Sequence, residues 1–362
     1  MTAPSDASRV GKWSEQEVLE RIEAARRRAP RIRERAITMA HGAGGRATHT
    51  LVEALFQPAF GNPSGDQAPF EVGGATLAVT TDSYVVSPLF FPGGDIGELA
   101  VNGTVNDLAV GGAEPLCITA GFILEEGLEL DVLRRVVESM ARAAAAAGVR
   151  LLAGDTKVVP RGKGDGLFVN TTGVGLVREP ARLGAGRVVV GDSVLVSGTV
   201  GDHGTAIMLA RGDLDIESDV ESDTAPLHRL CAAMLAAGDV HLMRDATRGG
   251  VATVLNELAR EAELAVAIRE DAVPVRDEVR GAAEILGIDP LYVANEGTLV
   301  AVVAPGDAEA VLAAMRAHPL GERASLIGEL RAEPAGMVFM HTAFGGSRVV
   351  DMLIGDPLPR IC

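Results

Sequence analysis

The spacing of apolar residues changes from segment to segment along this chain, and it predicts a mixture of strands and helices. In the first half, apolar residues alternate with threonine over 75–86, as in a half-buried strand, and recur at helical spacing over 96–110. An amphipathic pattern over 130–147 predicts a second helix, which Gly148 ends. Further strands are predicted at 116–124, 150–153 and 167–177.

The second half of the chain shows the same mixture of periods, and it opens with a buried-strand run at 193–197. A domain boundary is therefore predicted near Arg187. Two α+β domains, each with a sheet covered by helices, account best for this order of elements. Within the second half, helices are predicted at 205–210, 225–237, 251–262, 279–286 and 308–317, and strands at 240–243, 265–268, 299–303 and 325–330.

Residues 1–36 differ from the rest of the chain. They are rich in Glu and Arg, and Val18, Leu19, Ile22 and Ala25 recur at helical spacing. This pattern predicts an appended N-terminal helix. It is either a solvated surface arm or a docking element, and charge-rich segments of this kind are more often solvated.

Composition narrows the class of protein. At 362 residues, of which 47% are hydrophobic, the chain is long enough for two ordered domains. A net charge of -16 disfavours binding to nucleic acid. No apolar run is long enough to span a membrane, and the N-terminus lacks a signal-peptide pattern, so we expect a cytoplasmic protein. The cysteines, Cys117, Cys231 and Cys362, show no metal-binding spacing and predict no disulfide framework.

The chain ends in a cysteine on a proline-braced tail, residues 351–362. Pro357 and Pro359 favour an extended course, so residues 356–362 span about 20 Å at a rise of roughly 3.1 Å per residue. A thiolate is a strong nucleophile, and a thiol at the last position can be carried into and out of a cleft. The tail is therefore interpreted as a carrier of a chemical group, the alternative being a frayed end without a role.

A glycine-rich segment, residues 41–46, precedes a predicted helix. Its members His41, Gly42, Gly44 and Gly45 offer main-chain N–H groups that can approach an anion at the start of the helix. The segment matches neither the dinucleotide-binding fingerprint nor a Walker A loop. A phosphate cradle and a structural turn both remain open.

Four aspartates fall where the chain is expected to change direction: Asp82, Asp107, Asp155 and Asp245. Aspartate is favoured at turns and helix N-caps, so each of them has a structural explanation on its own. Gathered at the ends of neighbouring elements, however, carboxylates suit Mg²⁺, which prefers oxygen ligands and often bridges protein to nucleotide phosphates.

Three further residues are candidates for catalysis. Lys157 leaves the same face as Asp155 if their segment is extended, and it is otherwise a surface lysine in an ion pair. Glu296 stands before the strand at 299–303, where it is either a general base or a solvated side chain. His203, and the glycine pair Gly249-Gly250 behind Arg248, lie in loops that fit a site or a turn with positive φ.

Ten short motifs follow one another in order between residue 37 and the C-terminus. Taken singly each is a weak signal, but an ordered set that includes the tail is specific. The motifs are His-Gly-Ala-Gly-Gly (41–45), Thr-Asp-Ser-Tyr-Val-Val (81–86), Pro-Leu-Phe-Phe-Pro-Gly-Gly (88–94), Asn-Asp-Leu-Ala (106–109), Gly-Phe-Ile-Leu-Glu-Glu-Gly (121–127), Gly-Asp-Thr-Lys-Val-Val (154–159), Asp-His-Gly (202–204), Asp-Ala-Thr-Arg-Gly-Gly-Val (245–251), Ala-Asn-Glu-Gly (294–297) and Pro-Arg-Ile-Cys (359–362).

This ordered set resembles the HypE family of hydrogenase maturation factors, within the superfamily of aminoimidazole ribonucleotide synthetase and selenophosphate synthetase. The resemblance implies a first domain (37–187) that binds ATP and pairs its sheet across a homodimer. It implies a second domain (188–350) with an α/β sandwich, and a flexible tail (351–362). It gives no role to residues 1–36.

The resemblance also implies a chemistry. In that family the terminal cysteine, here Cys362, receives a carbamoyl group from the carbamoyltransferase HypF. ATP then drives the loss of water, leaving a protein thiocyanate, and the cyano group passes to iron held by HypC and HypD. Two alternatives remain: a superfamily enzyme acting on a diffusible substrate, and a non-catalytic assembly partner switched by nucleotide.

Site roles follow from the same resemblance. Mg²⁺ and the nucleotide are expected at the four aspartates, with the glycine segment near the phosphates. Lys157 is expected to steady the transferring phosphoryl group, and Glu296 to accept a proton from the carbamoyl nitrogen. Arg360 either favours the thiolate or contacts a partner. The nucleotide-binding set is His41, Gly42, Gly44, Gly45, Asp82, Asn106, Asp107, Asp155, Thr156 and Asp245, and the catalytic set is Cys362, Lys157, Glu296 and His203.

Overall fold

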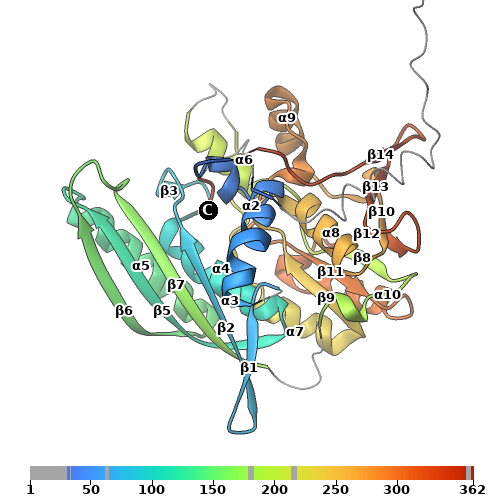
Figure 1. Ribbon diagram of the computed structural model, residues 1–362, viewed down its shortest axis with the longest axis horizontal. Helices are drawn as coiled ribbons and strands as arrows, with labels where there is room; N and C mark the ends of the chain where they lie inside the picture. Colours follow the sequence, from blue (N-terminus) through green and yellow to red (C-terminus); the bar gives the residue numbers. More distant parts are fainter. Residues whose placement is uncertain (1–30, 33, 62–64, 178–182, 213–217, 356–359) are drawn as a thin grey trace, which may run out of the picture.

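A computed structural model describes residues 31–32, 34–61, 65–177, 183–212, 218–355 and 360–362 (Figure 1). The predicted N-terminal helix at 1–36 falls almost entirely outside these residues, as do the prolines of the tail. Two sheets, each with its own helices, make up the described part of the chain. This is the α+β architecture that the sequence predicts.

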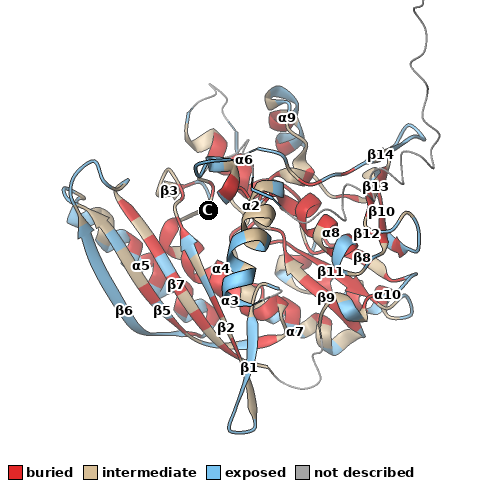
Figure 2. Ribbon diagram, viewed as in Figure 1, coloured by how far each residue is buried: buried red, intermediate tan, exposed pale blue. Residues whose placement is uncertain are grey.

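The first sheet has five strands in the order β1-β2-β7-β5-β6. All neighbouring strands are antiparallel except β5 and β6, which are parallel. Helices α4 and α5 pack together on one face, while β6 is exposed along nearly its whole length at the sheet's edge (Figure 2). The strands are β1 (Ala68–Val72), β2 (Ala75–Tyr84), β5 (Ala113–Glu125), β6 (Arg150–Val159) and β7 (Leu167–Val177), and the helices are α4 (Ile96–Val110) and α5 (Leu130–Ala147).

The second sheet has seven strands in the order β14-β13-β10-β12-β8-β11-β9, with helices on both faces. Val194 and Val196 of β8 face the core beneath α8, whereas Leu195 between them faces the core beneath α7 and α10. The strands are β8 (Ser193–Val196), β9 (Val240–Asp245), β10 (Ala265–Arg269), β11 (Leu299–Val303), β12 (Ser325–Arg331), β13 (Val338–His341) and β14 (Ser347–Val349). The helices are α6 (Asp202–Ala210), α7 (His228–Ala237), α8 (Gly250–Glu261), α9 (Asp277–Leu286) and α10 (Ala308–Arg316).

Helix α4 lies at the junction of the two domains. It is buried nearly all round, and it contacts both the first sheet and, in the second domain, α7 and β9. The Asp95 carboxylate caps its N-terminus by accepting hydrogen bonds from the N–H groups of Gly97 and Glu98. Side chains on α4 therefore lie where the two domains meet.

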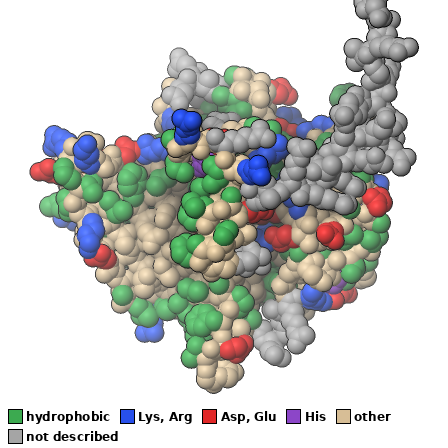
Figure 3. All heavy atoms as spheres, in the orientation of Figure 1, with side chains coloured by type: hydrophobic (Ala, Val, Ile, Leu, Met, Phe, Trp, Pro, Cys, Tyr) green, Lys and Arg blue, Asp and Glu red, His purple; other side chains and the backbone are tan. Residues whose placement is uncertain are grey.

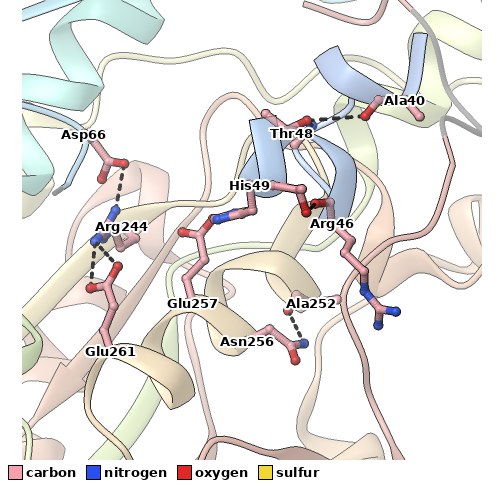
Figure 4. A network of polar contacts seen from close by, with 12 residues as sticks. Ala40, Arg46, Thr48, His49, Asp66, Arg244, Ala252, Asn256, Glu257 and Glu261 are labelled. Carbon is pink, nitrogen blue, oxygen red and sulfur yellow. Dashed lines mark hydrogen bonds and ion pairs between the residues drawn. The ribbon is translucent and has the colours of Figure 1, made fainter. Parts of the chain in front are cut away.

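Short elements complete the fold. Before the first sheet, residues 46–60 form one continuous helical stretch, whose α2 docks on α8 through the contact of His49 with Glu257 at 2.6 Å (Figure 4). These elements are η1 (Met39–Gly42), α2 (Arg46–Leu51), η2 (Val52–Phe56), α3 (Gln57–Phe60), β3 (Phe90–Phe91), β4 (Gly94–Asp95), η3 (Ala185–Arg187), η4 (Glu270–Ala272), η5 (Pro290–Tyr292) and η6 (Pro319–Gly321).

Predicted and observed elements agree best where the apolar period is strong. The helices at 96–110 and 130–147 and the strand at 167–177 have the predicted bounds, and Gly148 ends α5 in a left-handed conformation. The strand at 150–153 was predicted too short, because its polar centre, Gly-Asp-Thr-Lys, hides a strand that runs to Val159. Strands β1, β13 and β14, and the short strands β3 and β4, were not predicted. Of the helices in the described residues, none combines the length and apolar composition needed to cross a bilayer.

Candidate active site

The end of the chain lies between the two domains of its own protomer (Figure 1), and its last residues line a cavity there. The Val85 N–H donates to the carbonyl of Cys362 at 3.0 Å, and the Ser87 N–H donates to that of Arg360 at 3.2 Å. The tail therefore pairs like an added strand with the segment that follows β2. This places the terminal thiol at a fixed site.

A cavity of about 150 Å³ adjoins the tail. Its walls include Gly42 and Ala43 of the glycine segment, Arg248 and Gly249 of the loop before α8, and Cys362. The structure thus brings together two features that are far apart in the sequence, the glycine segment and Cys362. It also adds a cation, Arg248, to their surroundings.

Next to this cavity lies an acidic cluster, which we define as Asp66, Asp82, Asp107, Asp245 and Glu296. Asp82 comes from β2, Asp107 from α4 and Asp245 from the end of β9, while Glu296 precedes β11. Asp66 was not predicted. It lies in the loop before β1, and the Thr80 hydroxyl joins it to the cluster because it contacts both the Asp66 carbonyl (2.8 Å) and the Asp107 carboxylate (2.7 Å).

The carboxylates of the acidic cluster repel one another. Burial raises the pKa of Asp107 and of Asp245 well above the usual value, and the charges of neighbouring aspartates raise it further. Glu296 shows the same rise in pKa, caused by burial and then by Asp245 and Asp82. Burial raises the pKa of Asp66 to about 6, although Arg244 opposes the shift. Such a cluster favours a bound cation.

Two arginines partly compensate this charge. Arg244 contacts Asp66 at 3.2 Å and Glu261 at 3.3 Å (Figure 4). Arg248 lies 4.0 Å from Asp82, and its pKa is raised by the negative charge of Cys362 and then by that of Asp82. Arg248 is therefore the cation that faces the end of the chain.

Arg360 has other partners. Its guanidinium donates to the Val85 carbonyl and forms an ion pair with Asp165 in the loop before β7. Both contacts bind the tail to the first domain. The expectation that Arg360 acts on the thiol is therefore less well supported than the same role for Arg248.

The glycine segment packs closely against the second domain. A Cβ on Gly44 would lie 2.6 Å from the Arg248 carbonyl oxygen, and one on Gly45 would lie 2.5 Å from that of Leu353. Gly42 has open space around its Cα, and its carbonyl accepts a hydrogen bond from Arg248. His41 is buried and hydrogen-bonded to Thr38. Within this segment, Gly42 is the position whose main chain faces open space.

Asn106 lies beside Asp107 on α4, but its side chain is used by the protein itself. It donates to the carbonyls of Ala225 (3.0 Å) and Glu296 (3.1 Å), and it accepts from the Leu227 N–H (2.7 Å). Asn106, which is expected from the sequence to bind nucleotide, therefore holds the Glu296 loop against α4. Asp223, which was not predicted, supports the same loop by accepting the N–H group of Glu296.

The motif Asp155, Thr156 and Lys157 lies away from the acidic cluster within one protomer. The three residues are on β6, where Lys157 pairs with Asp155 at 2.6 Å in solvent. This ion pair lowers the pKa of Asp155. Asp155 is level with Ser83 of β2 across three strand spacings of about 4.8 Å, a separation of roughly 14 Å.

No three His, Cys, Asp or Glu side chains among the described residues are placed closely enough to hold a metal ion by themselves. The charge of the acidic cluster nevertheless fits a hard cation, provided that another molecule supplies the remaining oxygen ligands. Nucleotide phosphates are such ligands. Cys117, Cys231 and Cys362 form no disulfide with one another in this structure.

Comparison with known proteins identifies the family. Residues 64–177 match the N-terminal domain of AIR synthase related proteins, and residues 189–341 match the C-terminal domain. The chain is 54% identical over 338 residues to carbamoyl dehydratase HypE of Rhodobacter capsulatus, which covers 91% of this chain and 99% of that protein. The chain belongs to the HypE family. The family resemblance stated from the ordered motifs is thereby confirmed.

Solved HypE structures share the fold. A crystal structure of HypE in complex with ATP is 48% identical, with a TM-score of 0.77, and the alignment covers 90% of this chain and all of that one. HypE in a HypE-HypF complex is 45% identical, with a TM-score of 0.79, over 84% of this chain and 99% of that one. The two-domain fold expected for the superfamily is therefore confirmed.

Asp66 and Asp223 were missed from the sequence, and Arg248 was named only as the neighbour of the glycine pair in a candidate site loop. Asp66 ends a loop rich in Pro, Gly and Ser, and Arg248 stands between Asp245 and the glycine pair. Both positions carry a weak local signal. Asp223 carries none, because only the folded chain places it beside the Glu296 loop.

Proposed function

We propose that this chain dehydrates a carbamoyl group on Cys362 at the expense of ATP and leaves a thiocyanate, the source of the cyanide ligand in nickel-iron hydrogenase. The carrying observation is the position of Cys362. The terminal residue lies in a cleft between the domains, beside Arg248, the glycine segment and the acidic cluster. The names of relatives and the ATP complex of a HypE support the same activity.

The chemistry requires an activated oxygen, because amide oxygen is a poor leaving group. The carbamoyl oxygen attacks the γ-phosphorus of ATP in line, and the bond from that phosphorus to the bridging oxygen of ADP breaks. The C–O bond then breaks as phosphate leaves, and the nitrogen loses its two protons to give S–C≡N. One ATP is converted to ADP and phosphate for each carbamoyl group.

Asp82, Asp107 and Asp245 are proposed to hold Mg²⁺ together with the nucleotide phosphates, and Asp66 adds to their charge. The metal ion would neutralise negative charge on the phosphates. The open main chain at Gly42 is proposed to lie near those phosphates. His41, Gly44, Gly45 and Asn106 then act by shaping the site.

Glu296 is proposed to accept a proton from the carbamoyl nitrogen. Its raised pKa makes its carboxylate a stronger base than a solvated glutamate. Glu296→Gln keeps the size of the side chain but removes the base, and is expected to slow dehydration by about 100-fold. Dehydration by this variant at the wild-type rate would contradict the assignment.

A homodimer formed by the first sheet is proposed to complete the site. Strand β6 leaves apolar side chains exposed at the sheet's free edge, among them Leu151, Leu152 and Val158, and Figure 3 shows hydrophobic side chains on this side of the molecule. Asp155, Thr156 and Lys157 are remote from the cluster of their own protomer. In a homodimer, Asp155, Thr156 and Lys157 of one protomer would lie at the acidic cluster of the other protomer.

The proposed assignment places the chain in an assembly. Loading of Cys362 by HypF is supported by the HypE-HypF complex of a relative. Transfer of the cyano group to iron held by HypC and HypD, and action in the cytoplasm, complete the proposal. The domain division at 37–187, 188–350 and 351–362 is proposed on the same basis, with nucleotide and dimer contacts in the first domain.

Intact-mass analysis tests the function. Incubation with carbamoyl phosphate, ATP and the carbamoyltransferase is expected to add a carbamoyl mass at Cys362 and then to remove the mass of one water. Cys362→Ser, or deletion of the last residue, is expected to abolish both changes. An enzyme for a diffusible substrate would keep its turnover in these variants, and a nucleotide switch would leave Cys362 unmodified in the wild type.

A further inference from the structure

A buried histidine holds the last peptide group of the tail, the one that joins Ile361 to Cys362. His203, the second residue of α6, places Nε2 2.6 Å from the Ile361 carbonyl oxygen. Its Nδ1 lies 2.7 Å from the Ser222 hydroxyl oxygen. The ring is fully buried and meets Phe91 edge to face, with 5.6 Å between the ring centroids. Three contacts, with Ile361, Ser222 and Phe91, therefore fix the orientation of the His203 ring.

The hydrogen bonds define the state of this ring. The Ile361 carbonyl only accepts, so Nε2 of His203 carries the hydrogen and donates it. Burial lowers the pKa of His203 to about 4, so the ring is neutral at neutral pH, and Nδ1 accepts from the Ser222 hydroxyl. With both nitrogens engaged and the ring weakly basic, proton transfer in the reaction is not its role.

The other tail carbonyls have donors too. Arg211, directly after α6, donates to the Arg360 carbonyl at 2.6 Å, in addition to the Ser87 N–H. The Val85 N–H donates to the Cys362 carbonyl. We call these contacts, with that of His203, the tail clasp. The tail clasp therefore binds main-chain oxygen atoms of the tail. The Ile361 side chain, which is buried and only 5% exposed, holds the tail in place by apolar packing.

A carrier needs two positions. The carbamoyl group is dehydrated where ATP binds, but Cys362 must leave the cleft to be loaded by another protein. The free-energy difference between the two positions sets how much of each is present. His203 is suited to set this free-energy difference. The hydrogen bond from its Nε2 to the Ile361 carbonyl is buried and can form only while the tail is in the cleft.

We propose that His203, oriented by Ser222, is a positioning residue that retains the C-terminal tail in the cleft, so that its hydrogen bond to Ile361 governs the division between the retained and the exposed tail. This inference rests on the proposed function for its purpose. The clasp itself is independent of that function, because its contacts are those of the protein alone.

Alkylation of Cys362 measures the exposed tail without ATP or any partner. With a neutral maleimide in excess, and the modified residue located by peptide mass, His203→Ala is expected to react about tenfold faster than wild type. Ser222→Ala is expected to react about threefold faster, and His203→Gln, whose amide can donate, stays near the wild-type rate. An unchanged rate in His203→Ala would overturn the proposal.

A matched control separates retention of the tail from loss of stability. His241 is another buried histidine of the second domain, and its contacts are with Asp192 and Asp239. His241→Ala is expected to lower the melting temperature without a faster reaction of Cys362. If His241→Ala accelerated alkylation as much as His203→Ala does, general loosening would explain both, and the clasp would be rejected.

Single-turnover measurements then separate the clasp from the proposed function. In His203→Ala, dehydration of carbamoylated Cys362 is expected to fall about tenfold while loading by the carbamoyltransferase is not slowed. If wild type shows no dehydration but alkylation responds as expected, the proposed function fails and the clasp stands. If wild type dehydrates and His203→Ala slows loading and dehydration equally, the clasp fails.

Discussion

The acidic cluster and the Asp155-Lys157 pair use the same residue type in opposite environments. In the cluster, burial and neighbouring carboxylates raise the pKa values of Asp107 and Asp245. On β6, Lys157 lowers the pKa of Asp155, whose side chain is 70% exposed. Arg244 and Arg248 compensate the charge of the cluster only in part, which favours a cation, whereas the pair on β6 is satisfied in water. A carboxylate's use therefore depends on its surroundings more than on its motif.

The comparison also separates what one protomer can do from what needs a second copy. All residues of the acidic cluster belong to one chain, and they come from both of its domains. The β6 residues reach no site in their own chain. If they serve the same reaction, they serve it in a partner, and this can be tested.

Removing charge from the cluster should have the largest effect. Asp245→Asn is expected to slow dehydration of carbamoylated Cys362 by at least about 100-fold, because a ligand for the metal and nucleotide is lost. The control is Asp131→Asn on α5, which removes an exposed aspartate paired with Arg134 and should leave the rate within about twofold of wild type. Wild-type dehydration by Asp245→Asn, measured by mass, would refute the assignment.

Mixed dimers test the contribution of β6. Asp155→Asn and Asp245→Asn should each be nearly inactive alone. Co-expressed with different tags, they should recover about one quarter of wild-type sites, because half the dimers are mixed and each of those has one intact site. Activity of the mixture no greater than that of the separate variants would show that Asp155 does not act in the partner's site.

Arg248 and Arg360 provide a smaller test of which cation faces the thiol. Arg248→Gln is expected to slow alkylation of Cys362 at neutral pH by about threefold, because loss of a nearby positive charge disfavours the thiolate. Arg360→Ala loosens the tail and should speed the reaction. Equal slowing in both variants, followed across pH, would contradict the distinction drawn between these arginines.

The dependence of stability on pH gives the smallest effect. Because the pKa of Asp107 is raised on folding, the folded protein binds more protons than the unfolded chain above about pH 4, and this group destabilises the fold as pH rises through its folded pKa. Asp107→Asn removes this dependence on pH. The melting temperature of the variant, measured relative to that of wild type, should therefore rise by about 2–4 °C between mildly acidic and mildly alkaline pH.

Thermal unfolding with and without ATP and Mg²⁺ checks this expectation. The bound cation and nucleotide should stabilise wild type at the alkaline end and remove most of the variant's advantage. A difference between variant and wild type that is constant across pH would show that Asp107 has no raised pKa in the folded protein.

Sequence alone determined the features that depend on local order. The apolar period predicted the bounds of α5 and β7, because a helix or strand that buries one face must repeat at its own spacing. The ordered motifs identified the family. These signals lie within short segments and survive without any knowledge of contacts.

Only the tertiary structure decided which of the predicted residues meet. It joined Asp82, Asp107, Asp245 and Glu296 with the unpredicted Asp66, and left Asp155 across the sheet. It also placed His203, a candidate catalytic residue, in a hydrogen bond with the Ile361 carbonyl of the tail. The reason is physical: strand order and domain packing set distances between remote segments, and burial sets the protonation of the groups they bring together.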